Sequence, residues 1–261
     1  MRNLGSGAKN LHLAPHNGQR VIAHVVVGIK GRKMSEGIRV TLRDHMGSDL
    51  SVVNAARVSF AKESQWETIP EAGPVEGFLT YDDERLIKYL ARHNHWSPFG
   101  HASMQFHIKA PVFVARQLVK HQVGLVWNEV SRRYVDEEAE FYEPEEWRGR
   151  PQNSKQGSSD EVIDINPKQR MVDDYEQVCQ SAKWTYEHLL RLGVAPEQAR
   201  MVLPQSMFTE WYWSGTLMAF ARVCNLRCKP DTQKETQVVA NKIDVLAEEV
   251  FPWSWKALRD G

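Results

Sequence analysis

The stretch SMQFHIK, residues 103–109, followed by Pro111, decides the fold class. Three apolar side chains alternate with polar ones in the period-two pattern of a half-buried strand: Met104, Phe106 and Ile108. The polar face of this strand is therefore wet or lines a site. Because proline suits the first turn of a helix, we expect a helix to begin at Pro111. Its polar face is expected to combine residues spaced i, i+3 and i+4: Gln117, Lys120 and His121.

Helical patterns predominate in the rest of the chain. We expect a helix with Asp49 as its N-cap, a helix over 82–92 after Thr80, and a long helix from Asn166 to Gly193. The other expected elements are strands over 38–42 and 208–213, and helices over 196–200, 216–227 and 233–250. A few strands among many helices predict an α+β fold in which helices predominate.

The domain organisation follows from breaks in these patterns. Glycines and prolines punctuate residues 1–37 around one apolar run, so we predict an N-terminal extension there. Residues 38–261 are predicted to form one domain. Within it, the polar segment RPQNSKQGSSD at 150–160 predicts a mobile surface loop.

Composition excludes several classes of protein. The 261 residues include 33 basic and 33 acidic side chains, so the chain lacks the basic excess of a general nucleic-acid binder. The longest apolar run, Val21–Ile29, is far shorter than the ~20 residues of a membrane span, and no membrane association is expected. With no visible secretory signal and three cysteines, we expect a cytoplasmic protein.

No metal site is expected. Cys224 and Cys228 are separated by three residues in a predicted helix, and Cys179 is distant, so we interpret all three cysteines as packing residues. A loose group of histidines lacks nearby carboxylates and is interpreted as hydrogen-bonded structural residues: His93, His95, His101 and His107.

Basic residues gather in one region of the chain. Arg116, Lys120, Arg132 and Arg133 lie within eighteen residues, opposed only by Glu129. Arginines and a hydroxyl suit a phosphate, while amides and a carboxylate suit a base edge, so a nucleotide fits this segment. A surface network of ion pairs fits the charges as well. The sequence has no glycine-rich dinucleotide fingerprint and no phosphate loop, so another scaffold would have to hold a nucleotide or flavin.

The same segment resembles a known family. KHQ at 120–122, followed after eight residues by Ser131 in NEVSRRY, resembles the signature of flavin-dependent thymidylate synthases, an Arg-His-Arg triplet before Asn-Glu-x-Ser-x-Arg-Tyr. Further similar blocks occur in the family's order over roughly residues 38–255: DHMGSDLSVVNAARVSF, HNHWSPFGH, FHIKAPVFVARQ, ARMVLP and NLR.

The resemblance implies a fold, an assembly and a reaction. It implies a homotetramer of mixed α and β subunits, in which the FAD and substrate sites are built from several chains. The implied reaction transfers a methylene group from methylenetetrahydrofolate to C5 of dUMP and reduces it with a hydride from FAD, which NADPH reduces, giving dTMP.

The resemblance also implies flavin contacts. His121 should contact the flavin ring, and its neighbours Lys120 and Gln122 depart from the family's two arginines. Ser97 matches a flavin-contacting Ser or Thr, whereas Gly100 stands where the family commonly has an acid. Thr216 and Met218 replace Asn and Arg, so those contacts do not transfer. Glu129 is also assigned to the cofactor. Arg222 is assigned to it from its own chemistry and not from the resemblance, because it is a cation near the centre of a predicted helix and could reach an anionic cofactor. A plain surface arginine is the alternative interpretation of Arg222.

The nucleotide is assigned to a second set of matching positions. They are Gln117, Lys120, Glu129, Ser131, Arg132, Arg133, Arg200 and Arg227. Ser131 is interpreted as a phosphate ligand rather than a nucleophile. Arg227 is predicted to be catalytic, because a guanidinium at the uracil edge would stabilise negative charge that develops as C5 becomes nucleophilic.

The sequence leaves two alternative functions open. The same chemistry on UMP differs from the dUMP reaction by one hydroxyl. A nucleotide-binding or RNA-binding module that kept the fold and lost catalysis would fit the altered triplet, and would contain no flavin.

Overall fold

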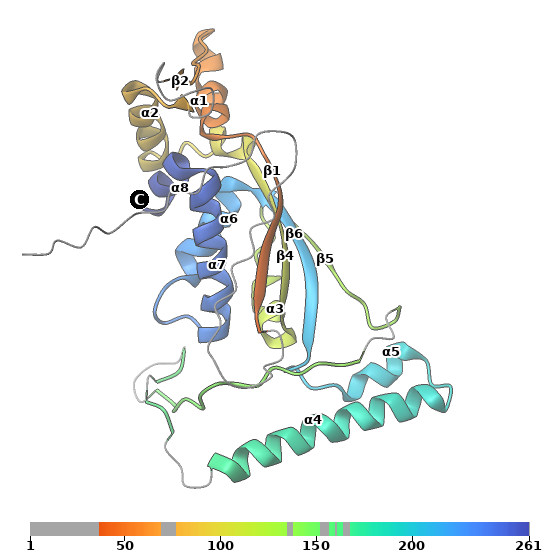
Figure 1. Ribbon diagram of the computed structural model, residues 1–261. Coiled ribbons are helices and arrows are strands. Elements are labelled where there is room, and N and C mark those ends of the chain that lie inside the picture. Colours follow the sequence, from red (N-terminus) through yellow and green to blue (C-terminus); the bar gives the residue numbers. More distant parts are fainter. Residues whose placement is uncertain are drawn as a thin grey trace, which may run out of the picture.

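The computed structural model describes residues 37–68, 77–134, 138–151, 157–159, 161–163 and 168–260 (Figure 1). The predicted N-terminal extension lies outside the described residues except for Gly37. Of the predicted loop over 150–160, only 150–151 and 157–159 are described. The extension and the mobility of the loop therefore stay predictions.

A four-stranded antiparallel sheet forms the centre of the described structure. Its strand order is β1-β4-β6-β5, with bounds β1 (Arg39–Met46), β4 (Ser103–Pro111), β5 (Leu125–Glu129) and β6 (Phe208–Thr216). The predicted strands over 38–42, 103–109 and 208–213 are confirmed, and each is longer than predicted. Two short strands, β2 (Glu67–Thr68) and β3 (Gly77–Phe78), form a second sheet.

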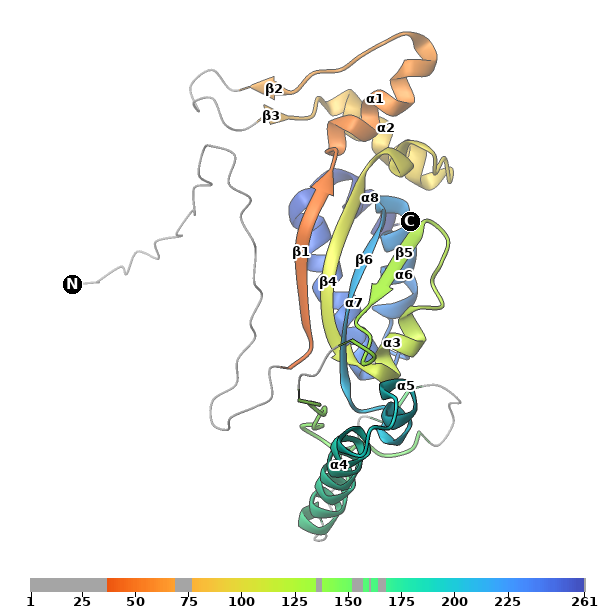
Figure 2. The ribbon, with the colours of Figure 1, turned by 90° about the vertical axis from the view of Figure 1, so that its right-hand side faces the viewer.

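Strand β5 is not among the predicted elements. Its side chains do alternate, since Leu125 and Trp127 are half-buried while Val126 and Asn128 are exposed. The alternation lasts only five residues, at the edge of the sheet (Figure 2). A short edge strand that ends in Asn and Glu lacks the β-branched and aromatic run that would have identified it.

Helices cover one face of the sheet. The alternation in β4 is confirmed, because Met104, Phe106 and Ile108 are buried. Phe106 pairs in register with Trp213 of β6, and Ile108 pairs with Trp211. All four side chains pack into the same core as α6, α7 and α8. These helices lie on one side of the sheet, and no described helix covers β1, β4 and β6 on the side that faces the viewer in Figure 2.

Helices predominate, as predicted. The α-helices are α1 (Asp49–Arg57), α2 (Tyr81–Arg92), α3 (Val112–Leu118), α4 (Lys168–Arg191), α5 (Pro196–Ala199), α6 (Leu217–Arg227), α7 (Lys234–Val250) and α8 (Pro252–Arg259). Three 3₁₀ turns accompany them: η1 (Val58–Phe60), η2 (Pro98–His101) and η3 (Arg200–Val202). The predicted helices are confirmed within a few residues, with Asn166 and Pro167 outside the described residues; α8 was not predicted.

The prediction that Asp49 caps α1 is wrong. Ser48 is the N-cap, and Asp49 is the first helical residue and is buried. The Asp49 carboxylate instead accepts hydrogen bonds from the backbone N–H groups of Ser254, at 2.7 Å, and Trp253, at 3.4 Å. These groups belong to the first turn of α8, whose N–H groups have no partner within the helix. Asp49 thus links α1 to a helix some two hundred residues away in the sequence.

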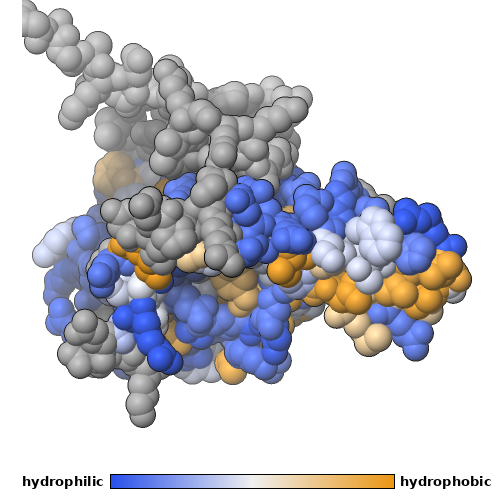
Figure 3. Space-filling model, turned by 90° about the horizontal axis from the view of Figure 1, so that it is seen from below, coloured by the Kyte–Doolittle hydropathy of each residue, from blue (hydrophilic) through white to orange (hydrophobic). Residues whose placement is uncertain are grey.

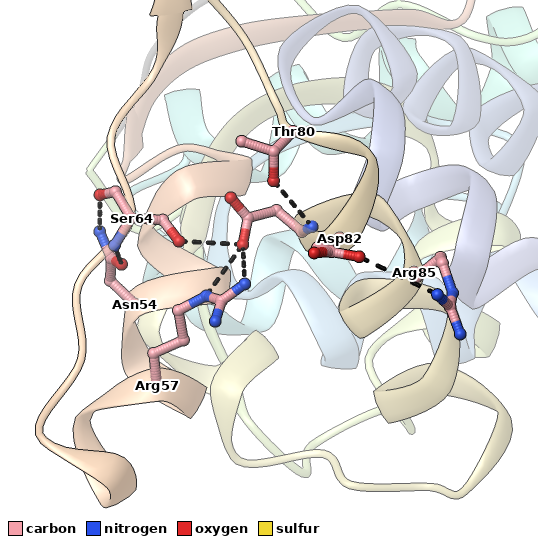
Figure 4. Close-up of polar contacts among 7 residues, drawn as sticks. Asn54, Arg57, Ser64, Thr80, Asp82 and Arg85 are labelled. Carbon is pink, nitrogen blue, oxygen red and sulfur yellow. Dashed lines mark hydrogen bonds and ion pairs between the residues drawn. The ribbon is translucent and has the colours of Figure 1, made fainter.

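A buried carboxylate ties α2 to the first helical segment (Figure 4). Asp83 accepts hydrogen bonds from Nε of Arg57 and from Oγ of Ser64, each at 2.9 Å. Thr80 caps α2, since its Oγ1 accepts from the Asp83 N–H at 3.1 Å. Asn54 and Ser64 pair through side-chain amide and backbone. This network fixes α2, which leads into η2 and β4.

Candidate active site

Two candidate residues far apart in the sequence meet where α6 ends. Arg227 is the last residue of α6, and its Nε donates a hydrogen bond to Nε2 of His121 at 3.0 Å. Both side chains are half-buried. Burial and the charge of Arg227 lower the pKa of His121, and burial lowers the pKa of Arg227. His121 is therefore a neutral acceptor for the guanidinium. We call these two residues the basic pair.

The predicted helical face of Gln117, Lys120 and His121 is wrong. Helix α3 ends at Leu118, so Lys120 and His121 lie beyond it, and only Gln117 belongs to its last turn. The chain must reverse there to bring β5 beside β6, and it turns through Gly124 at φ +75°. The i, i+4 relation therefore does not place these side chains together.

The chain after His121 crosses directly over the start of α6. A Cβ at Gly124 would lie 3.1 Å from Cβ of Ala219 and 3.3 Å from Oγ1 of Thr216. A Cβ at Gly215 would collide with the carbonyl oxygen of Gly124. Thr216 caps α6, since its Oγ1 accepts from the Ala219 N–H at 3.2 Å. This close crossing positions His121 against Arg227, and it gives Thr216 a structural role.

A second group of candidates lines a cavity of about 500 Å³ at the other end of β5. Glu129, Arg132 and Arg200 all contribute to its wall, together with Lys109 and Thr209. We call it the β5 cavity. Lys109 pairs with Glu140 at 2.6 Å, whereas the exposed side chain of Arg200 has no ion-pair or hydrogen-bond partner among the described residues. The wall therefore combines three cations, Lys109, Arg132 and Arg200, with four carboxylates, those of Glu129, Glu138, Glu140 and Glu210.

Ser131 and Arg133 lie next to this cavity in sequence and contact each other. Nε of Arg133 donates to Oγ of Ser131 at 3.2 Å, and the Arg133 guanidinium lies 5.0 Å from the Tyr134 ring centre. Within the described part of the chain, no histidine or lysine contacts the Ser131 hydroxyl. A serine beside an arginine and without a base is suited to bind an anion rather than to attack a substrate.

The remaining candidates are separate from both groups. Ser97, Lys120, Gln122 and Arg222 are exposed, and their side chains contact no other described residue by hydrogen bond or ion pair. Gln117 is half-buried, and its Oε1 is buried without a hydrogen-bond partner among the described residues. Such an orphaned acceptor costs about 1–3 kcal/mol unless a ligand or solvent donor reaches it.

Sequence reasoning missed three residues around the β5 cavity: Lys109, Trp127 and Thr209. Lys109 lies on the strand face that was expected to be wet or to line a site, so a signal for it existed. Trp127 and Thr209 could be found only from the register of β5 and β6, because β5 itself was missed.

Most of the histidines and cysteines interpreted as structural have defined neighbours. His107 contacts Arg43 and Glu210, each at 2.8 Å, and His93 and His95 pack against Tyr89. Among the described residues, one group could offer three metal ligands within 4.8 Å of one another: Cys224, Cys228 and Asp244. Its carboxylate already accepts from Arg259 at 2.7 Å and from Trp255 at 2.9 Å.

Similarity to known proteins identifies the family. The family model described as thymidylate synthase complementing protein matches residues 41–253. Flavin-dependent thymidylate synthases from Thermus thermophilus and Thermosipho africanus are each 38% identical to this chain, over 221 and 216 residues. These alignments cover 85% and 83% of this chain, and 75% and 88% of the two relatives.

Solved structures of two complexes are similar to this chain as well. Crystal structures of the UMP/dUMP methylase PolB from Streptomyces cacaoi, bound with 5-Br dUMP or with 5-Br UMP, match with TM-scores of 0.70 and 0.71. Their identities are 32% and 31%, covering 85% of this chain and 95% and 94% of those chains.

The chain belongs to the flavin-dependent thymidylate synthase family. The resemblance seen in the sequence is confirmed, as are the α+β fold and the methyltransferase class of enzyme. None of the described helices combines the length and the apolar character needed to cross a bilayer.

Proposed function

We propose that this protein methylates C5 of a pyrimidine nucleoside monophosphate, and that its main reaction converts dUMP to dTMP. Methylenetetrahydrofolate supplies the carbon, and FAD, reduced by NADPH, supplies the hydride. The observation that carries this proposal is the basic pair. In this pair, the neutral imidazole of His121 orients the guanidinium of Arg227, which stands at the position that the family resemblance implies to be catalytic.

Arg227 is suited to act on the uracil ring. Its Nε is occupied by His121, so both terminal Nη groups are available for the O2 and N3 side of uracil. Charge that develops on that side as C5 becomes nucleophilic is stabilised by a donor fixed in advance, which costs no reorganisation during the reaction.

We assign the phosphate to the end of β5 that lies beside Arg132 and Arg200. Arg200 and Arg132 line the β5 cavity, and Ser131 with Arg133 lies beside it. Arginine forks and a hydroxyl are the donors that phosphate oxygens prefer. No described acid neutralises Arg200, so its charge is available to a ligand.

The two groups point to sites shared between chains. They lie at opposite ends of β5, and the four residue steps from Leu125 to Glu129 span about 13 Å. A second copy packed antiparallel would bring the basic pair of one chain beside the β5 cavity of another. The homotetramer implied by the family, with sites built from several chains, provides such an arrangement.

Exposed apolar residues support this assembly. Val123 and Val126 on the segment leading through β5 are 77% and 71% exposed. The arm formed by α4 and α5 extends away from the sheet (Figure 1), and hydrophobic surface follows it (Figure 3). Exposed apolar residues in and directly after α4 are Val178, Trp184 and Leu192, and Met201 lies in η3. Monomeric proteins rarely expose contiguous apolar surface of this kind, so we propose that other copies cover it.

The residues assigned to the cofactor have the chemistry to bind an anionic redox group. Lys120 and Gln122 flank it at the surface, and Ser97 is exposed at the start of η2. Gly100 leaves open space, since a Cβ there would meet only Trp96, at 3.8 Å. With Arg222, these side chains would bind FAD, which supplies a hydride when reduced. Gln122 contributes no charge, so Lys120 and Arg222 provide the compensation for an anionic flavin.

UMP is the second candidate substrate. The observation that favours it is that the PolB structures hold analogues of both nucleotides. A site with a partner for the 2′-hydroxyl would prefer UMP, because leaving that partner unpaired costs about 1–3 kcal/mol with dUMP.

A flavin spectrum and parallel turnover assays test the proposal. The purified protein is expected to show flavin absorbance near stoichiometry that NADPH bleaches, and to form dTMP faster than the methylated ribonucleotide. Protein that takes up no flavin on reconstitution would support the non-catalytic alternative and overturn the enzyme proposal. Faster turnover of UMP would reassign the substrate. The cytoplasmic location stays a prediction.

A further inference from the structure

Glu129 is held by two neutral donors that lie outside the family signature. Oγ1 of Thr209 donates to Oε1 of Glu129 at 2.8 Å, and Nε1 of Trp127 donates to Oε2 at 3.2 Å. Each carboxylate oxygen therefore accepts one fixed hydrogen bond and keeps a further lone pair for a ligand.

The two donors are themselves fixed by the sheet. Thr209 is buried on β6. The Trp127 indole stacks on Trp211, with ring centres 4.4 Å apart and an interplanar angle of 18°, and meets Trp213 edge-on at 5.4 Å. In the β5 and β6 register, Trp127 pairs with Trp213 and Glu129 with Trp211, which places these side chains on one face.

This arrangement matters because Glu129 shares its cavity with Arg200. A freely rotating glutamate that reached Arg200 would form an ion pair with it and neutralise the charge that a phosphate needs. The structure shows no ion pair between these two described residues. Thr209 and Trp127 occupy both oxygens from the sheet side instead, so the carboxylate stays in a single orientation.

We propose that Thr209 and Trp127 are positioning residues, which aim the Glu129 carboxylate at the bound nucleotide and keep it from pairing with Arg200. This inference rests on the proposed function. It assigns part of the nucleotide affinity to two residues outside the signature, one of them a buried threonine.

A matched pair of variants at Thr209 tests the inference. Thr209→Val keeps the shape and removes the donor, whereas Thr209→Ser keeps the hydroxyl. Titration calorimetry of the flavin-loaded protein is expected to show dUMP binding about tenfold weaker for Thr209→Val and within about twofold of wild type for Thr209→Ser. Trp127→Phe, which keeps the ring stack and loses the N–H, is expected to weaken binding by about threefold.

A double-mutant cycle separates positioning from general structural damage. In a Glu129→Ala background, Thr209→Val is expected to change the dUMP affinity by less than about twofold, because the group it positions is gone. Equal losses in both backgrounds, or wild-type binding by Thr209→Val, would overturn the inference.

Failure of the proposed function would look different. A wild-type protein that binds neither dUMP nor UMP would overturn that function. The melting temperatures of the four proteins in the cycle would then still decide the Thr209 and Glu129 interaction: additive shifts would overturn it, and coupled shifts would support it.

Discussion

The two ends of β5 offer two different kinds of binding surface. At one end, the basic pair is built onto a core helix, and its members already hydrogen-bond each other. At the other end, the β5 cavity is lined by strand ends and by η3, and its cation Arg200 is exposed and unpaired. Under the proposed function, this difference corresponds to two roles, in which the preorganised group acts on the ring and the open group binds the phosphate.

Removing Arg227 should have the largest effect. Arg227→Ala is expected to lower kcat by about 100- to 1,000-fold, because it deletes a donor aimed at charge that develops in the reaction. Steady-state assays of dTMP formation measure this, with the exposed Arg85→Ala as the control at wild-type rate. A variant that changed only KM would contradict the role given to the basic pair.

Removing Arg200 should affect binding instead. Arg200→Ala is expected to raise the KM for dUMP by roughly 10- to 100-fold with kcat nearly unchanged, because phosphate contacts persist equally in the ground and transition states. The same assays measure it. A fall in kcat as large as that for Arg227→Ala would erase the distinction between the two ends.

Alanine substitutions at two glycines test how tightly the chain packs at the end of β5 near the basic pair. Gly193→Ala at φ +81° has open space around it and should cost about 1–2 kcal/mol for the backbone alone. Gly124→Ala at φ +75° also meets Ala219 and Thr216, and should cost about 1 kcal/mol more. Denaturant unfolding compares the two variants. Equal losses would show that the crossing over α6 is not tightly packed.

A pH series gives the smallest effect. The folded state holds the pKa of His121 below its unfolded value near 6.5, so the unfolded chain binds the proton first as pH falls. The contribution of His121 to stability is therefore constant above about pH 6.5 and declines below it. His121→Gln cannot titrate, and its melting temperature should fall less than that of wild type between about pH 7 and pH 5.5. Melting temperatures that fall equally in the two proteins over this pH range would contradict the assignment of His121 as a neutral acceptor.

The sequence predicted most of the fold and supplied the candidate site residues, but it did not predict how the fold groups them. The alternation in β4 and the apolar spacing in α6 and α7 are local patterns, and the structure confirms them. The cap of α1 was misassigned because Ser48 and Asp49 are both good N-caps, and only the distant N-terminus of α8 explains why Asp49 is used elsewhere.

The features that the sequence did not predict depend on how strands far apart in the sequence pair. Nothing local indicates that α3 ends at Leu118, since the helix stops where β5 must return to pair with β6. The same pairing places Trp127 and Thr209 around Glu129. The contact between Thr209 and Glu129 joins residues eighty positions apart, and no periodicity within either segment encodes it.

The hydrogen bond from Arg227 also fixes the tautomer of His121. Because Nε2 accepts that bond, the ring proton of the neutral imidazole must reside on Nδ1. The edge of the ring opposite Arg227 is then a hydrogen-bond donor, and any group that approaches it must be an acceptor. Nitrogen-15 chemical shifts of the two ring atoms would report this polarity directly.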